Sequence, residues 1–162
     1  MFGVNPKLFI CSRKNDSSMK NIDGLELSPK KNEYLKYMLK MGGVVKTTDI
    51  SSQFHVDPST ITKAINDLSS TSLIKHVPYR GITLTERGRE YAAFLVRRHR
   101  ILGLVLSRYG LSSDEACKIA SMFEGYVPKD VIDKMCASMG HPTTGICGKI
   151  DHDICCCCPE DN

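Results

Sequence analysis

Apolar residues between positions 28 and 140 recur every three or four residues, and turn residues divide them into six segments with the spacing of amphipathic helices. The first predicted helix begins at Ser28-Pro29 and ends at Gly42-Gly43, since serine and proline favour helix starts and glycine favours helix ends. A second helix at about 47–54 and a third that begins at Asp57-Pro58 are separated by a short turn. This pair predicts a helix-turn-helix unit.

A short β-hairpin is predicted directly after the third helix. Residues 73–79 and 82–85 have the composition of strands, and Arg80-Gly81 provides a tight turn between them. A helix-turn-helix followed by a hairpin is a winged helix. Three more helices are then expected: a long one from Thr85 to about Tyr109, one from the capping box Ser112-Ser113-Asp114-Glu115, and one from about Pro128 to Met139.

The predicted fold is therefore mostly α with a small β-hairpin, in which a winged helix-turn-helix (28–90) precedes a helical dimerisation region (91–140). Residues 1–27 are expected to form a flexible tail, and residues 141–162 a loop-like, Cys-rich tail. The last helices have more apolar surface than a small winged domain needs, which favours a homodimer. Because the chain has no apolar run of about 18 residues and no signal-peptide pattern, we expect no membrane partner and a cytoplasmic location.

Charged residues are unevenly distributed along the chain. Residues 30–100 contain 13 Lys and Arg against 6 Asp and Glu, whereas residues 101–162 contain 5 against 9. A basic part joined to an acidic part fits a nucleic-acid-binding unit carried by a separate assembly unit. Ordinary scatter of surface charge is the alternative.

The third helix is the expected DNA-reading element, because the second helix of a helix-turn-helix places its first residues in the major groove of duplex DNA. Ile61 and Ile65 point inward and leave polar residues outside. The base-reading positions are Ser59, Thr60, Thr62 and Lys63, and phosphate contacts are expected from Lys46, Thr47 and Arg80. Backbone amides at the helix N-termini would add to the phosphate contacts. The alternatives are an ordinary helix start with a solvated charge, and a winged helix that binds protein.

Several segments together resemble one known family. They are Glu33-Tyr34-Leu35, the turn at 56–62, the wing at 79–85, Arg97-Arg98-His99-Arg100, Glu115-Ala116-Cys117 and Gly140-His141-Pro142-Thr143. In order and spacing they resemble the diphtheria toxin repressor and manganese transport regulator family of iron- or manganese-dependent transcriptional regulators, over about residues 25–148. The resemblance implies a two-fold dimer on a palindromic operator, with Fe(II) or Mn(II) between the DNA-binding and dimerisation helices. It is to the short form of the family, which lacks a C-terminal barrel domain.

Five residues match metal-ligand positions of that family. They are Glu33 in the first helix, His99 in the fourth, and Cys117, Ser121 and Glu124 in the fifth. The spacing of four and then three places the last three on one helical stripe. The alternatives are that His99 is a core histidine, that Cys117 is a small buried hydrophobe, and that Glu124 is an exposed acid at a helix end.

Four positions depart from the family pattern. Gly125 stands where the family has a ligand His, Gly103 where it has a Glu, and Lys36 where the manganese-sensing branch has a second acid; Ser121 itself replaces a Cys or Glu. The remaining donors are two carboxylates, one imidazole and one thiolate. This set favours Fe(II), Zn(II) or Co(II) over Mn(II), which prefers oxygen, so we expect Fe(II) rather than Mn(II).

The C-terminal cysteines offer a possible second metal or redox site. Six soft donors lie within twelve residues: Cys147, His152, Cys155, Cys156, Cys157 and Cys158. Zinc and iron–sulfur sites separate their ligands by two or more residues, which four consecutive cysteines do not. Binding of Zn(II) or iron, disulfide-forming redox chemistry and a disordered tail all remain open.

The sequence as a whole predicts a metal-dependent DNA-binding regulator, and most simply a repressor of metal-uptake or metal-homeostasis genes. The alternative is a winged-helix regulator with a degenerate core metal site, which senses redox state or another metal through its cysteines. No nucleophile–base pairing, phosphate loop or zinc-protease motif indicates an enzyme or a small-molecule substrate.

Overall fold

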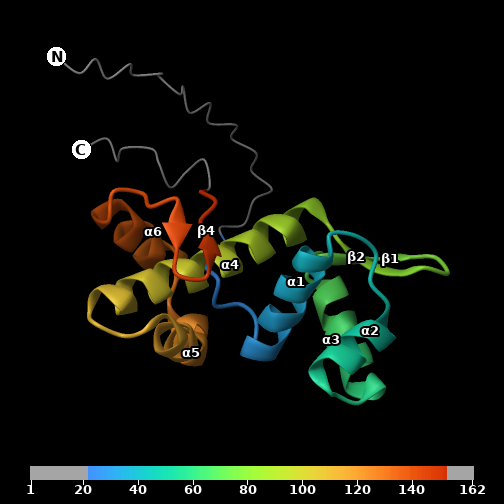
Figure 1. Cartoon of the computed structure of the whole chain (residues 1–162). Coiled ribbons are helices and arrows are strands. Elements are labelled where there is room, and N and C mark those ends of the chain that lie inside the picture. The colour runs from blue at the N-terminus through green and yellow to red at the C-terminus, as the bar shows by residue number, and fades with distance from the viewer. Residues whose placement is uncertain (1–21, 153–162) are drawn as a thin grey trace, which may run out of the picture.

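The computed structural model describes residues 22–152, which form mostly helices (Figure 1). The helices are α1 (Pro29–Met41), α2 (Thr47–Phe54), α3 (Pro58–Ser70), α4 (Glu86–Arg108), α5 (Ser113–Phe123), the 3-10 turn η1 (Glu124–Tyr126) and α6 (Lys129–Ser138). The strands are β1 (Ile74–Val77), β2 (Gly81–Leu84), β3 (Thr144–Gly145) and β4 (Gly148–Lys149), in two antiparallel hairpins. The predicted fold class, mostly α with a winged helix-turn-helix, is confirmed.

The wing is the β1–β2 hairpin, which extends beyond the helices (Figure 1). Its register places Ile74 opposite Leu84, and both side chains are buried. The segment before α2 adds a further bridge, because the amides of Val45 and Ile82 each donate to the other's carbonyl at 2.8 and 2.9 Å. Gly81 allows this close approach: its φ is +131°, and a Cβ there would lie 2.4 Å from the Val45 carbonyl oxygen.

Local capping explains most helix boundaries. In the predicted capping box of α5, the Glu115 amide donates to Ser112 Oγ at 3.4 Å, and Glu115 Oε2 accepts from the Ser112 amide at 3.0 Å. Thr85 caps α4 by accepting from the Gly88 amide at 3.0 Å. The expected caps Ser28 and Asp57 precede α1 and α3, but neither side chain makes a capping hydrogen bond, so the following prolines carry these helix starts.

The 23-residue helix α4 runs through the middle of the molecule (Figure 1). It continues without a break through the expected boundary between residues 90 and 91, and it packs against α1, α5 and α6. The core residues Phe94 and Leu95 are at most 1% exposed. Helix α4 therefore joins the winged helix to the C-terminal helices as one rigid element.

The structure differs from both expected tails where it describes them. Leu27 belongs to the core, and Arg98 Nη1 on α4 donates to the Gly24 carbonyl at 2.8 Å, so residues 22–27 are packed. The chain after α6 forms the β3–β4 hairpin, whose Ile150 is 1% exposed and donates its amide to the Thr143 carbonyl at 2.8 Å. Apolar periodicity missed this hairpin because its strands have only two residues each. The rest of both expected tails lies outside the described residues.

Within residues 22–152, none of the helices is both long enough and apolar enough to cross a membrane.

Candidate functional site

The predicted DNA-reading residues lie on the outer face of α3. Ile61 and Ile65 are at most 1% exposed and anchor the helix in the core. Ser59, Thr60, Thr62 and Lys63 are all exposed. The Thr62 hydroxyl donates to the Pro58 carbonyl at 2.8 Å, which leaves its methyl group and its lone pairs for a base edge.

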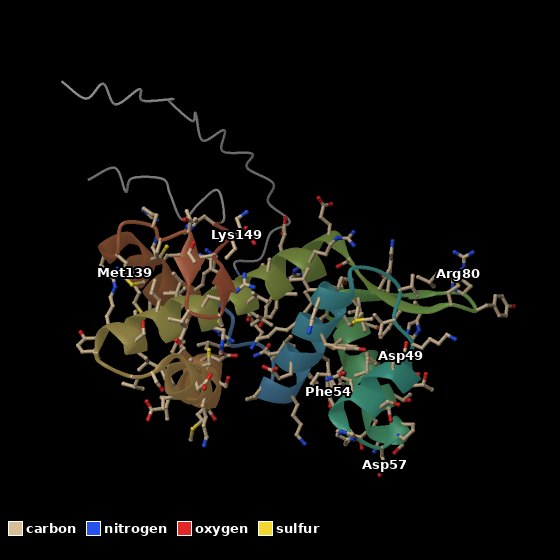
Figure 2. The ribbon with its side chains drawn as sticks, viewed as in Figure 1. Asp49, Phe54, Asp57, Arg80, Met139 and Lys149 are labelled. Carbon is tan, nitrogen blue, oxygen red and sulfur yellow. The ribbon has the colours of Figure 1, made fainter. Side chains whose placement is uncertain are left out.

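The predicted phosphate contacts lie at the wing and in the segment beside it, since a Cβ at Gly81 would lie 3.3 Å from Lys46 Cα. Lys46 and Arg80 are exposed and Thr47 is half-buried, and Arg80 is located on the wing (Figure 2). At the amino end of α2, the Lys46 amide donates to Asp49 Oδ2 at 3.1 Å. This carboxylate already satisfies an amide at the amino end of α2, so less of that helix end is open to a phosphate.

A cluster of sulfur and imidazole donors lies where α4, α5 and the C-terminal hairpin meet. The ligand atoms of His99, Cys117 and Cys147 all lie within 4.8 Å of one another. Cys117 comes from α5 and His99 from α4, as the sequence predicted. Cys147, which the sequence grouped with the C-terminal cysteines, comes from the turn between β3 and β4.

The hairpin packs closely against α4 at Gly103, which has no side chain. A Cβ at Gly103 would lie 3.1 Å from Ile146 Cδ1, so a larger residue would require the Ile146 side chain to move. Arg100 holds the same hairpin by donating to the Lys149 carbonyl (Lys149 is labelled in Figure 2). The Glu that family resemblance expects at 103 would occupy the place that Ile146 fills beside Cys147.

Glu124 holds His99 but is not one of the clustered donors. Its side chain is 6% exposed, and Oε2 accepts from His99 Nδ1 at 2.6 Å, which leaves Nε2 as the ring nitrogen open for coordination. Oε1 accepts from the Lys36 ammonium. Burial alone raises the pKa of Glu124, but the His99 hydrogen bond and the Lys36 charge outweigh it and hold the pKa below its usual range.

Two further predicted ligands, Glu33 and Ser121, are also outside this cluster. Glu33 is half-exposed and accepts from Lys36 Nζ at 2.8 Å, so Lys36 links Glu33 on α1 to Glu124. Ser121 is exposed and donates to the Cys117 carbonyl at 2.9 Å. An ammonium group therefore stands between two of the expected carboxylate ligands.

The donors that are brought together fit a borderline or soft divalent ion. One imidazole and two thiols suit Fe(II), Co(II) or Zn(II) better than Mn(II). Burial and the hydrogen bond with Cys147 raise the pKa of the Cys117 thiol, so an ion must displace a proton there. The expected C-terminal group is divided: Cys147 joins this cluster, His152 joins a second one described below, and Cys155–Cys158 lie outside the described residues.

Both parts of the chain match models of one protein family. Residues 26–82 match the family model "Iron dependent repressor, N-terminal DNA binding domain", and residues 85–152 match "Iron dependent repressor, metal binding and dimerisation domain". Among curated relatives, the HTH-type transcriptional regulator MntR of Geobacillus kaustophilus is 27% identical over 103 residues, which are 64% of this chain and 73% of that protein.

Solved structures contain the same fold. A hypothetical protein of Sulfolobus solfataricus superposes with a TM-score of 0.66 at 22% identity, over 76% of this chain and 96% of that one. A manganese-dependent transcriptional repressor in complex with manganese superposes with a TM-score of 0.61 at 27% identity, over 71% of this chain and 55% of that one. The matched families and relatives are DNA-binding regulators, and none of these is described as an enzyme.

Proposed function

Because this chain belongs to the iron-dependent repressor family of metal-dependent DNA-binding transcriptional regulators, we propose that it is a metal-responsive repressor of metal-uptake or metal-homeostasis genes, which binds a palindromic operator in the cytoplasm as a homodimer. The observation that carries this proposal is the cluster of His99, Cys117 and Cys147. These residues come from three elements that must keep their places if the two reading helices of a dimer are to match an operator.

The chain's own donors favour Fe(II) over Mn(II) at this cluster. Two thiols and an imidazole replace the oxygen ligands that Mn(II) prefers. A related solved structure is a manganese-dependent repressor, but the nearest carboxylate here, that of Glu124, already binds His99 and Lys36. Glu124 orients the imidazole by accepting a hydrogen bond from His99 Nδ1.

Helix α4 is the element through which the cluster would act on DNA binding. Its first half packs beside the wing and α1, and His99 lies near its middle. A bound divalent ion supplies a positive charge that both thiolates and the imidazole share. When these donors are drawn together, α5 and the hairpin are fixed against α4, which favours a single arrangement of the two reading helices in a dimer.

An exposed apolar surface at α5 supports the homodimer. On α5, Ile119 is 38% and Met122 70% exposed, and Tyr126 in the η1 turn that follows is 76% exposed. Charge at the centre of such a surface prevents its burial. We therefore expect Met122→Glu to be monomeric in sedimentation equilibrium. Met41→Glu, at a methionine on α1 that is 56% exposed, should stay dimeric; two dimeric variants would place the interface elsewhere.

Metal titration tests the cluster directly. The protein is the full chain with Cys155–Cys158 changed to serine, so that their thiols do not compete, and Fe(II) and Mn(II) are titrated without oxygen. Cys147→Ser should weaken Fe(II) binding by at least about tenfold, since even outer-sphere partners contribute about 10- to 100-fold. Ser121→Ala should change neither affinity, because that hydroxyl is bonded to the Cys117 carbonyl. Weaker Fe(II) binding by Ser121→Ala, with unchanged binding by Cys147→Ser, would favour the ligand set expected from the sequence. Tighter binding of Mn(II) than of Fe(II) would contradict the metal preference.

Redox sensing is the second candidate, because Cys117 and Cys147 lie in one cluster. Hydrogen peroxide would oxidise the two thiols to a disulfide. It takes up their two protons and two electrons and is reduced to two water molecules. If metal-free protein changes its operator affinity on peroxide treatment, and Cys147→Ser abolishes that change, redox sensing is the correct function of the pair. The raised pKa of the Cys117 thiol lowers its thiolate fraction and slows such oxidation.

A further inference from the structure

A second cluster of donors lies at the end of α6, apart from the first cluster of His99, Cys117 and Cys147. We infer that Cys136, His141 and His152 form a structural zinc site that fastens the chain after α6 to that helix. Their ligand atoms all lie within 4.8 Å of one another. Cys136 comes from α6, His141 follows that helix, and His152 follows β4.

The distances between the donors match the coordination shell of zinc. Cys136 Sγ lies 3.6 Å from His141 Nδ1 and 3.6 Å from His152 Nδ1. In tetrahedral zinc with bonds of about 2.3 Å to sulfur and 2.0–2.1 Å to nitrogen, neighbouring S and N ligands lie about 3.6 Å apart. The three donors thus already have two edges of the tetrahedron, and a fourth position stays open for water or another ligand.

The hydrogen bond of His152 sets the tautomer that coordination requires. Its Nε2 lies 3.0 Å from the Pro142 carbonyl oxygen, which can only accept, so Nε2 carries the proton. In the neutral ring, Nδ1 then presents its lone pair toward Cys136. A ring nitrogen that donates to a backbone carbonyl while the other nitrogen faces the ion is the usual arrangement of zinc-bound histidine.

The surroundings of Cys136 make an ion more suitable than hydrogen bonds alone. Its side chain is 0% exposed, and it faces two imidazoles whose rings are 5.9 Å apart and nearly perpendicular. A thiol has one proton and is a weak donor, so it can donate to one of these nitrogens only. A thiolate and two neutral imidazoles instead match the charge and softness that zinc prefers.

This site would also support the first cluster, a consequence that rests on the proposed function. His141 and His152 lie on either side of the β3–β4 hairpin, and the turn of that hairpin carries Cys147. An ion held by both histidines fixes the two ends of the segment against α6. The hairpin then presents Cys147 to His99 and Cys117 without the entropy cost of ordering a free loop.

Cobalt and zinc binding test the second site without using DNA. The protein is the full chain with Cys117, Cys147 and Cys155–Cys158 changed to serine, which removes the thiols of the first cluster and of the C-terminal cysteines. We expect one Co(II) to bind with the visible absorption of a tetrahedral site and a thiolate-to-cobalt band, and Zn(II) to displace it. His152→Gln should weaken binding at least tenfold, since ligand loss costs no less than the roughly 10- to 100-fold of an outer-sphere change.

The matched control is His76→Gln, which makes the same substitution at an exposed histidine of the wing. If His152→Gln and His76→Gln bind Co(II) equally well, the proposal is overturned. NMR of the imidazole nitrogens in the same serine-substituted protein, with His152 intact, guards against misfolding of the His152 variant. One equivalent of Zn(II) should shift Nδ1 of both His141 and His152 and leave Nε2 of His152 protonated; unchanged resonances would also overturn the proposal. Either result is independent of whether the first cluster binds metal or the protein binds DNA.

Discussion

The ammonium of Lys36 should stabilise the fold by neutralising a buried carboxylate. Lys36 is 17% exposed and Glu124 6%, and Lys36 also binds Glu33, so the pair joins α1 to the turn after α5. Lys36→Met keeps the length and apolar stem of the side chain but removes its charge. Glu124 then keeps the hydrogen bond from His99, whose Nδ1 lies 2.6 Å from Oε2, and the nearby charge of Arg98.

The expected loss follows from this geometry. Breaking a buried ion pair costs about 3–5 kcal/mol when the remaining charge has no partner. Because His99 remains and Lys36 is partly exposed, we expect Lys36→Met to lower the free energy of unfolding by about 2–3 kcal/mol. Glu124→Gln should cost less, about 1–2 kcal/mol, since it removes the buried charge itself. The double variant should reveal a coupling energy of about 1–2 kcal/mol.

Urea unfolding of chelator-treated protein measures these values, and Lys36→Met should move the midpoint by about 1 M. The matched control is Lys134→Met, whose ammonium lies 3.8 Å from Asp130 with both side chains mostly exposed. Exposed pairs contribute about 0.2–1 kcal/mol, so this control should hardly move the midpoint. Equal losses at Lys36 and Lys134, or a coupling energy near zero, would refute the assignment of Lys36 as the partner of Glu124.

Three further predictions follow from other parts of the molecule. If a dimer neutralises about 6–8 phosphates, log K for DNA binding should fall with log salt at a slope of about −5 to −7, and a slope near zero would exclude this DNA surface. Lys63→Ala should reduce sequence preference, whereas Arg80→Ala should weaken binding to all sequences about equally. Ile150→Ala should cost about 2–4 kcal/mol in urea unfolding because Ile150 is 1% exposed, whereas an intact midpoint would return residues 141–152 to the loop-like tail expected from sequence. Burial raises the pKa of Asp133, but hydrogen bonds from Lys129 and Arg97 outweigh it and lower the pKa. The stabilisation from Asp133 is therefore present above the unfolded pKa of about 3.9 and is lost as pH falls through the lower folded pKa. Asp133→Asn should be less stable than wild type at pH 7 and lose that difference in acid, and a difference independent of pH would contradict this.

The local signals in the sequence were sufficient for the helices. Capping residues such as Ser112 and Glu115 and apolar residues three or four apart depend only on neighbours in the chain, and the predicted boundaries of α2, α4 and α6 lie within one residue of those observed. The charge of Lys36 was visible too, but its position between Glu33 and Glu124 depends on how α1 packs against the end of α5. Pairwise contacts of this kind arise only once the fold has formed.

The sulfur sites were harder to predict for the same reason. Cys147 was grouped with its sequence neighbours, whereas its hairpin packs closely against α4 at Gly103 and places it beside His99 and Cys117. Cys136 had been passed over, because it is also a small core residue four positions after Ile132 on the buried face of α6. The sequence does contain one clue. Gly145 and Gly148 lie on either side of Cys147, and this spacing indicates a tight hairpin rather than a loose tail.

The central claim is that metal binding at His99, Cys117 and Cys147 controls DNA binding, and the most direct measurement is operator affinity at fixed salt, with Fe(II) and with chelator, in the absence of oxygen. Coupling between two sites is typically about 1–3 kcal/mol, or roughly 5- to 150-fold in affinity. We predict that Fe(II) tightens operator binding within this range for the wild-type dimer and that Cys117→Ser removes most of the difference without changing the affinity in chelator. Equal operator affinity with and without Fe(II) in the wild-type protein would contradict the account.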